Sequence, residues 1–275
     1  MKTIVKILPL ILLTALASCK KDKKSDPAPE TPGTPSVPTP TTPTTPTVSQ
    51  PGSLKLHFEN MVDTNDLVFG NNYVNAMGDT FQVSKFNYYI SNVVITKADN
   101  STFVEPNSYH LVRHSITSSG LINIANVPAG SYKSVSFMIG VDSTRNVSGT
   151  QNGDLDPVVA SDMYWSWNTG YIFVKLEGSS PKSGASDKSL IYHVGGGGGV
   201  NKTQRMVTLT FGASSADVSS TATPIVHISV DAMEMLKTPN AIDFATNYFL
   251  MMPGANAKKY ADNYADMFRF EHIHN

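Results

Sequence analysis

Histidine is the residue type in this sequence that most clearly suggests chemistry. Seven histidines occur, and His272 and His274 are separated by one residue in the closing segment 270–275. In an extended strand these two imidazoles point to the same face, and neutral imidazole is a ligand for copper, zinc and nickel. The spacing indicates a metal-binding pair, although a solvated terminal strand would show the same pattern.

Three further histidines lie in segments with strand character. His57 is in an alternating run of apolar and polar residues, and His193 lies just before five consecutive glycines that would leave open space beside its ring. We interpret His227, in the middle of a strand-like run, as structural. The candidate metal ligands are therefore His57, His193, His272 and His274.

Strand parity restricts how these residues can meet. His57 alternates with the apolar residues of its own segment and so faces away from them. In contrast, His272 and His274 lie an even number of positions from Phe268 and Phe270, which would put them on the same face as these apolar residues. The imidazoles can converge only at strand ends or across a β-bulge, unless one face assignment is wrong.

The two tryptophans of the chain, Trp165 and Trp167, lie close together in the segment 163–171. On a strand they would point to one face and form a large aromatic surface. Such a pair suits a core anchor, and it also suits a platform on which a sugar stacks.

The composition excludes several classes of function. The 21 basic and 22 acidic residues give a net charge of −1, so electrostatic binding to nucleic acid is not expected. A single cysteine rules out an intrachain disulfide. The sequence has no G-x-S-x-G, H-E-x-x-H or G-x-x-x-x-G-K-[ST] motif, and we predict a binding protein rather than an enzyme.

The N-terminal region predicts export and a lipid anchor. Residues 1–18 combine two lysines, a short apolar run and small residues, which is typical of a signal peptide. Cys19, in the context Leu-Ala-Ser-Cys, resembles the lipobox cysteine of bacterial lipoproteins, which is diacylated after cleavage. Residues 19–52 contain nine prolines and predict an extended tether. We expect anchoring to the outer membrane, on its periplasmic or its outer side.

Residues 53–275 predict an all-β domain. Short runs rich in Val, Ile, Tyr, Phe and Thr are separated by clusters of Gly, Asn, Asp and Pro. We expect an antiparallel β-sandwich of Ig-like, Greek-key type, with about seven to nine strands and long loops. One or two short helices are expected, over 241–250 and 256–264. The strand candidates are 54–58, 86–96, 132–141, 171–177, 206–211, 225–233 and 267–274.

Six motifs occur in order along this domain. They are LKLHFEN (54–60), FQVSKFNYYISN (81–92), NVPAGSYKSVSFMIG (126–140), MYWSWNTGYIFVKLEG (163–178), YHVG (192–195) and ADNYADMFRFEHIHN (261–275). The set resembles the MbnP family, copper-binding proteins first described beside methanobactin genes. The block containing both tryptophans is its most specific part.

The resemblance implies an extracytoplasmic β-sandwich that binds copper, typically Cu(I), through histidine nitrogens. In some members of the family a tryptophan is oxidised to kynurenine by a di-haem partner of the cytochrome-c-peroxidase type, and by position Trp165 or Trp167 is the candidate here. By the same resemblance, His193 corresponds to the H-[LV]-G histidine of the family. His57, His272 and His274 fit its lipoprotein branch.

We therefore predict a lipid-anchored protein that captures or stores copper through histidines near the tryptophan pair. The alternative is a surface adhesion or glycan-binding β-sandwich, which would share the tether and the aromatic surface. In that case the histidines could be scattered without consequence.

Overall fold

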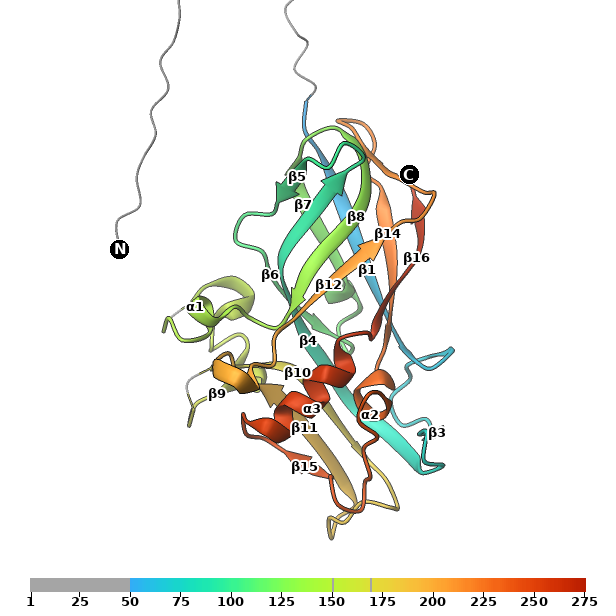
Figure 1. The fold of residues 1–275 in the computed structure, drawn as a ribbon, viewed down its shortest axis with the longest axis vertical. Helices are drawn as coiled ribbons and strands as arrows, with labels where there is room; N and C mark the ends of the chain where they lie inside the picture. The colour runs from blue at the N-terminus through green and yellow to red at the C-terminus, as the bar shows by residue number, and fades with distance from the viewer. Residues whose placement is uncertain (1–49, 150, 169) are drawn as a thin grey trace, which may run out of the picture. The chain divides into compact units, whose positions relative to one another are not determined.

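The computed structural model describes residues 50–275 except 150 and 169, and Figure 1 shows their fold. The predicted signal peptide, Cys19 and all but the last three residues of the predicted tether lie outside the described residues. The first strand, β1, spans Gly52–Val62 and begins at the predicted domain boundary. Among the described residues, no helix has the length and apolar character needed to cross a membrane.

The fold is mostly β, with two sheets and a few short helices, as the sequence predicts. In the described chain the smaller sheet has five strands, in the order β16–β14–β1–β2, with β7 also paired to β1. Besides β1, its strands are β2 (Asn65–Asp66), β7 (Leu121–Val127), β14 (Ile225–Asp231) and β16 (Phe268–His274).

The larger sheet is built around β4 (Thr80–Lys97), which runs for 18 residues and bends along its length (Figure 1). Its main path is β12–β8–β4–β10–β11–β15. These strands are β8 (Gly130–Ile139), β10 (Gly170–Ser179), β11 (Ser189–Gly195), β12 (Arg205–Thr210) and β15 (Phe249–Leu250). Shorter strands flank the path: β3 (Tyr73–Val74), β5 (Thr102–Val104), β6 (Tyr109–Arg113), β9 (Tyr164–Trp165) and β13 (Ala216–Val218).

The helices are short and lie between strands. The α-helices are α1 (Ser143–Asn146), α2 (Glu234–Lys237) and α3 (Ala255–Tyr264). Single 3₁₀ turns occur at η1 (Thr117–Gly120), η2 (Gly153–Leu155), η3 (Ser161–Met163) and η4 (Gly199–Asn201). Helix α3 matches the helix predicted over 256–264.

The other predicted helix, over 241–250, is wrong. This segment is a loop that ends in β15. Within it, the Asp243 carboxylate accepts hydrogen bonds from the backbone N–H of Ala245 and from the hydroxyl of Thr246. Local side-chain bonds of this kind satisfy the backbone in a turn and compete with helix formation.

The expectation of a purely antiparallel sandwich is also wrong. Strands β1 and β14 pair in parallel over seven residue pairs, and β11 and β15 also pair in parallel. Alternation of apolar and polar residues fixes which face a residue occupies, but it does not fix the direction of the neighbouring strand. The predicted number of strands was too low because several strands have only two or three residues.

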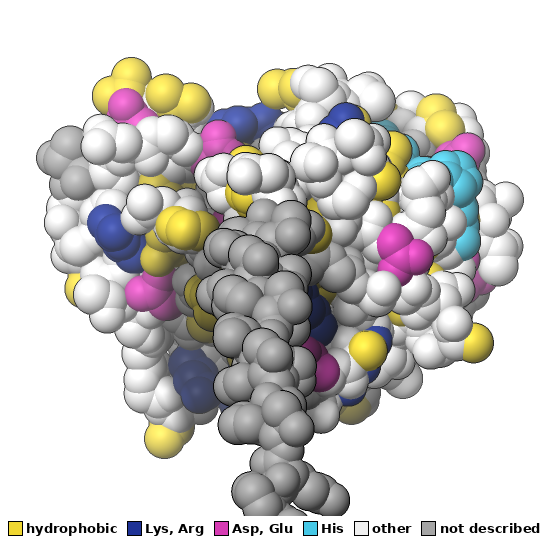
Figure 2. Space-filling model, turned by 90° about the horizontal axis from the view of Figure 1, so that it is seen from above, with side chains coloured by type: hydrophobic (Ala, Val, Ile, Leu, Met, Phe, Trp, Pro, Cys, Tyr) yellow, Lys and Arg dark blue, Asp and Glu magenta, His cyan; other side chains and the backbone are white. Residues whose placement is uncertain are grey.

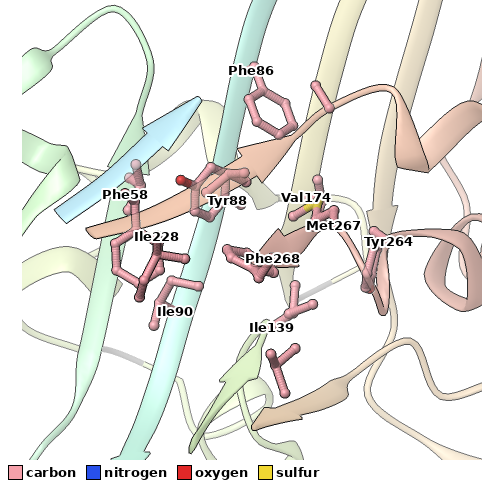
Figure 3. Packing of buried hydrophobic residues seen from close by; sticks show 14 of the residues in the cluster. Phe58, Phe86, Tyr88, Ile90, Ile139, Val174, Ile228, Tyr264, Met267 and Phe268 are labelled. Carbon is pink, nitrogen blue, oxygen red and sulfur yellow. The ribbon is translucent and has the colours of Figure 1, made fainter. Parts of the chain in front are cut away.

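The two sheets pack face to face over one aromatic core. Phe268 of β16 meets Phe58, Tyr88 and Phe137 edge-on, with ring centroids 5.1–5.9 Å apart. Phe58 lies on the smaller sheet, whereas Tyr88 and Phe137 lie on the larger one. Figure 3 shows Phe58, Tyr88 and Phe268 in this core. The contacts hold β16 and β1 in place, and these strands carry histidines on their other face.

Candidate metal centre

Three histidines form a row across the outer face of the smaller sheet. The parallel register places His57 of β1 beside His227 of β14, and the antiparallel register places His227 beside His272 of β16. Residues paired directly across neighbouring strands share a face. His274 follows two residues after His272 and so takes the same face. We call His57, His227, His272 and His274 the histidine ladder.

A β-bulge in β16 makes this arrangement possible. His227 pairs with His272, but the next residue of β14, Ile228, pairs with Phe270, so Glu271 is an extra residue in β16. The extra residue switches the face on which later side chains lie. Phe268 can therefore face the core while His272 faces outward, which is one of the solutions that strand parity allowed.

One end of the ladder brings three ligand atoms close together. The Nδ1 atoms of His57 and His227 are 3.4 Å apart. The Glu59 carboxylate lies 3.5 Å from the Nδ1 of His57 and 3.3 Å from the Nδ1 of His227. Glu59 is two residues after His57 on β1 and shares its outward face. These three residues form the first ligand group.

The other end of the ladder forms a second ligand group from His227, His272 and His274. The His227 and His272 rings stack with centroids 4.2 Å apart and planes 11° apart. The His274 ring centroid is 4.8 Å from each of the other two. One ligand atom from each residue lies within 4.8 Å of the others, and the same holds for the first group.

Solvent reaches the ladder, but its centre is largely covered. The side chain of His227 is 13% exposed, that of His57 31% and that of Glu59 42%, whereas His272 and His274 are exposed. His57 and Glu59 also line a hollow of about 180 Å³ beside η1. Histidine side chains gather visibly on the surface in Figure 2. An ion could therefore enter from solvent and contact ligands that are already held in place.

His227 is the candidate ligand that sequence reasoning left out, since it was interpreted as structural. Its Nε2 is buried and has no hydrogen-bond partner within the described chain. A buried polar atom without a partner needs an explanation, and an ion or water that binds there is a common one. The donor set of imidazoles and one carboxylate suits a borderline transition metal such as copper or zinc. The residues present thus fit a metal site.

The structure does not bring His193 to the ladder. His193 lies on β11 of the larger sheet, where its Nε2 is 2.7 Å from a Glu177 carboxylate oxygen. The Lys175 ammonium is 3.9 Å from the same carboxylate, and the Lys85 ammonium is 3.6 Å from its other oxygen. The two ammonium groups attract the Glu177 carboxylate, and the buried His193 donates a hydrogen bond to it.

Burial lowers the pKa of His193 below its usual 6.5, and the Lys175 charge adds to this effect against the opposing contribution of Glu177. The unfolded chain gains this proton near pH 6.5, whereas the folded chain gains it only at lower pH. We therefore expect the free energy of unfolding to fall as the pH drops below about 6.5. His193→Gln removes the titration and should flatten this dependence.

Urea unfolding at pH 7.5, 6.5 and 5.5 measures the effect in both proteins. His110→Gln is the matched control, because His110 also pairs with a carboxylate, that of Glu105, at 2.9 Å. An identical pH dependence in the wild type and His193→Gln would rule out this role of His193.

The tryptophan pair lies elsewhere in the fold. Trp165 ends β9, which pairs with β10 of the larger sheet, and Trp167 lies in the turn that follows. The rings are 5.5 Å apart, but Trp165 is 3% exposed and Trp167 is 55% exposed. The buried indole packs on Gly195 at the end of β11. The pair is therefore a half-buried anchor, and the two rings do not form the exposed platform that the glycan-binding alternative needs.

The fold and the ladder together define a mostly β protein with a surface cluster of histidines spaced as metal ligands. The MbnP family profile matches residues 51–255, and the chain belongs to the MbnP family. The matched range includes His57 and His227 and ends before β16. The predicted family resemblance is confirmed.

The chain is similar to a solved structure, MbnP from Methylosinus trichosporium, with 13% sequence identity and a TM-score of 0.46. That similarity covers 80% of this chain and 97% of the other. No curated protein matches the sequence.

Proposed function

We propose that this protein captures copper at the histidine ladder and acts as a binding protein rather than an enzyme. The observation that carries the proposal is the convergence of the first ligand group. His57, Glu59 and His227 come from two strands distant in sequence. The Nδ1 atoms of the two histidines are 3.4 Å apart, and the two oxygens of Glu59 lie 3.5 Å from the Nδ1 of His57 and 3.3 Å from that of His227.

This separation suits ligands that share one ion. Metal–nitrogen and metal–oxygen bonds of about 2.0–2.2 Å in a tetrahedral site put neighbouring ligand atoms about 3.3–3.6 Å apart. Both Nδ1 atoms and the carboxylate are thus at coordination distances before an ion arrives. Strands held by a packed core keep such a ligand set pre-organised, which reduces the entropy lost on binding.

The choice of copper rests on chemistry and on family membership. Divalent copper binds a given set of nitrogen and oxygen ligands more tightly than nickel or zinc does. Imidazoles alone can also hold Cu(I), and His272 and His274 add two of them. The family resemblance points to the same metal.

We place the protein in the cell envelope, attached to the outer membrane by lipid on Cys19, with residues 19–52 as a tether. A di-haem enzyme of the cytochrome-c-peroxidase type is the proposed partner. Of the two tryptophans, Trp167 is the one that such a partner could reach, because Trp165 is buried. Oxidation of Trp167 would be separate from the ladder, which lies on the other sheet.

Copper binding is tested on the purified full-length chain in detergent, by competition with a chelator of known affinity. The wild type should retain copper at micromolar concentrations. His57→Ala combined with His274→Ala removes one ligand from each group. The double variant should have a copper affinity lower by at least about 100-fold, because loss of a residue that only hydrogen-bonds to a metal ligand typically lowers metal affinity 10–100-fold.

His110→Ala is the control for losing a histidine outside the ladder, and it should bind copper like the wild type. Zinc is titrated in parallel to test the metal preference. Failure of the wild type to retain either metal would refute the proposed function.

A further inference from the structure

His227 is the one residue that belongs to both ligand groups. Its Nδ1 lies 3.4 Å from the Nδ1 of His57 and 3.3 Å from Glu59. Its Nε2, on the opposite side of the ring, is buried without a hydrogen-bond partner among the described residues. The two ring nitrogens of His227 are thus in different surroundings, one in the first ligand group and one unpaired.

The chemistry of imidazole makes this difference informative. A neutral imidazole has one nitrogen with a lone pair and one nitrogen with a proton. If an ion binds the Nδ1 of His227, the proton must be on Nε2, where the protein supplies no acceptor. A buried N–H without an acceptor is unfavourable. A metal-binding His usually donates this second N–H to a carboxylate, a carbonyl or water.

The second ligand group offers an alternative use for this nitrogen. His272 stacks on the His227 ring at 4.2 Å, and His274 lies at 4.8 Å from it. Both side chains are exposed, so their rings can turn and direct a nitrogen lone pair toward an ion. The stacked arrangement of His227 and His272 requires this turn, because a bound ion lies close to the plane of each ring that holds it.

We propose, on the basis of the metal-binding function above, that the ladder holds two copper ions bridged by the His227 ring. The first ion is bound by the Nδ1 atoms of His57 and His227 and by Glu59. The second is bound by the Nε2 of His227 together with His272 and His274. Binding of the second ion displaces the remaining N–H proton of His227, which passes to solvent, and the oxidation state of the metal does not change.

The first site should fill before the second. The Nδ1 atoms of His57 and His227 are already 3.4 Å apart and each has a Glu59 oxygen within 3.5 Å, whereas the second site needs two exposed rings to rotate and the bridging ring to lose a proton. The carboxylate of Glu59 also offsets part of the charge of the first ion. The two ions therefore bind in sequence and with different affinities.

The test uses Cu(II) chloride and the full-length chain in detergent, with copper content measured after desalting and the EPR signal integrated on the same sample. We expect two copper ions per chain at saturation. Two Cu(II) ions joined by one imidazolate couple their spins, so the EPR intensity should be well below that of the bound copper. With one equivalent of copper, the intensity should equal the copper content.

Single substitutions separate the two sites. His57→Ala and His274→Ala should each bind one copper ion with full EPR intensity, while His110→Ala should keep two coupled ions. One copper ion per wild-type chain, or two ions with full EPR intensity, would overturn the bridge and leave the proposed copper binding intact. A wild-type chain that retains no copper would overturn both. The wild-type result decides the matter even if a variant fails to fold.

Discussion

His227→Ala is expected to lower copper affinity by at least about 100-fold, more than any other single substitution in the ladder. His227 belongs to both ligand groups, so its loss leaves two residues at each end. Loss of a residue that only orients a metal ligand typically lowers metal affinity 10–100-fold. Loss of a ligand shared by both groups should lower it further. Chelator competition on the full-length chain measures the effect.

The loss of affinity must be separated from loss of the fold. The His227 side chain is largely buried but makes no hydrogen bond through Nε2, so circular dichroism should show a folded variant. His110→Ala provides the matched control, as His110 pairs with Glu105 outside the ladder. Wild-type affinity in His227→Ala would show that the ladder does not hold the metal.

Phe268→Ala is expected to lower the free energy of unfolding by about 3–5 kcal/mol, the usual cost of truncating a buried phenylalanine. Phe268 is 4% exposed and meets three aromatic rings from both sheets. Its removal leaves a cavity at the point where β16 packs on the core. Urea unfolding with a fixed slope between variants measures the change.

Phe249→Ala makes the same substitution on the surface. Phe249 is 55% exposed on the short strand β15, so its truncation should change the free energy of unfolding by less than about 0.5 kcal/mol. Equal losses in the two variants would mean that the aromatic core around Phe268 does not join the sheets. Copper binding by Phe268→Ala should weaken as well, since the same strand carries His272 and His274.

Part of the site could be predicted from the sequence because alternation shows which way a side chain points. His57 was correctly placed on the polar face of its strand, opposite Leu54 and Leu56. The same reasoning applies to His227. It lies on the same face of its strand as Ser229, whereas Val226 and Ile228 face the core. That signal in the sequence would have added His227 to the candidate ligands.

The partner of each histidine could not be predicted in this way. The pairing of His57 with His227 depends on a parallel register between distant strands, which no local pattern encodes. The outward face of His272 depends on the bulge at Glu271. The sequence contains a sign of that bulge. The inward residues Phe268 and Phe270 are two positions apart, but the next inward residue, Ile273, follows Phe270 by three.

His193 shows the limit of reasoning from a motif. Its neighbouring glycines suggested open space, but its side chain is directed by its strand register, which pairs it with Lys175. The charges of Lys175 and Glu177 then determine its surroundings. A histidine opposite a lysine on the next strand is in a poor position to attract a cation.

The pairing of β1 with β14 also determines when the ladder can exist. His57 and His227 are 170 positions apart in the chain, and His272 follows only at the C-terminal end. A nascent chain that ends before β14 has His57 and Glu59 on β1 but lacks the histidines of the other strands. On the proposed function, metal can be held only after β14 has been synthesised and has paired with β1, and proteolytic loss of β16 would remove the second ligand group while leaving the first.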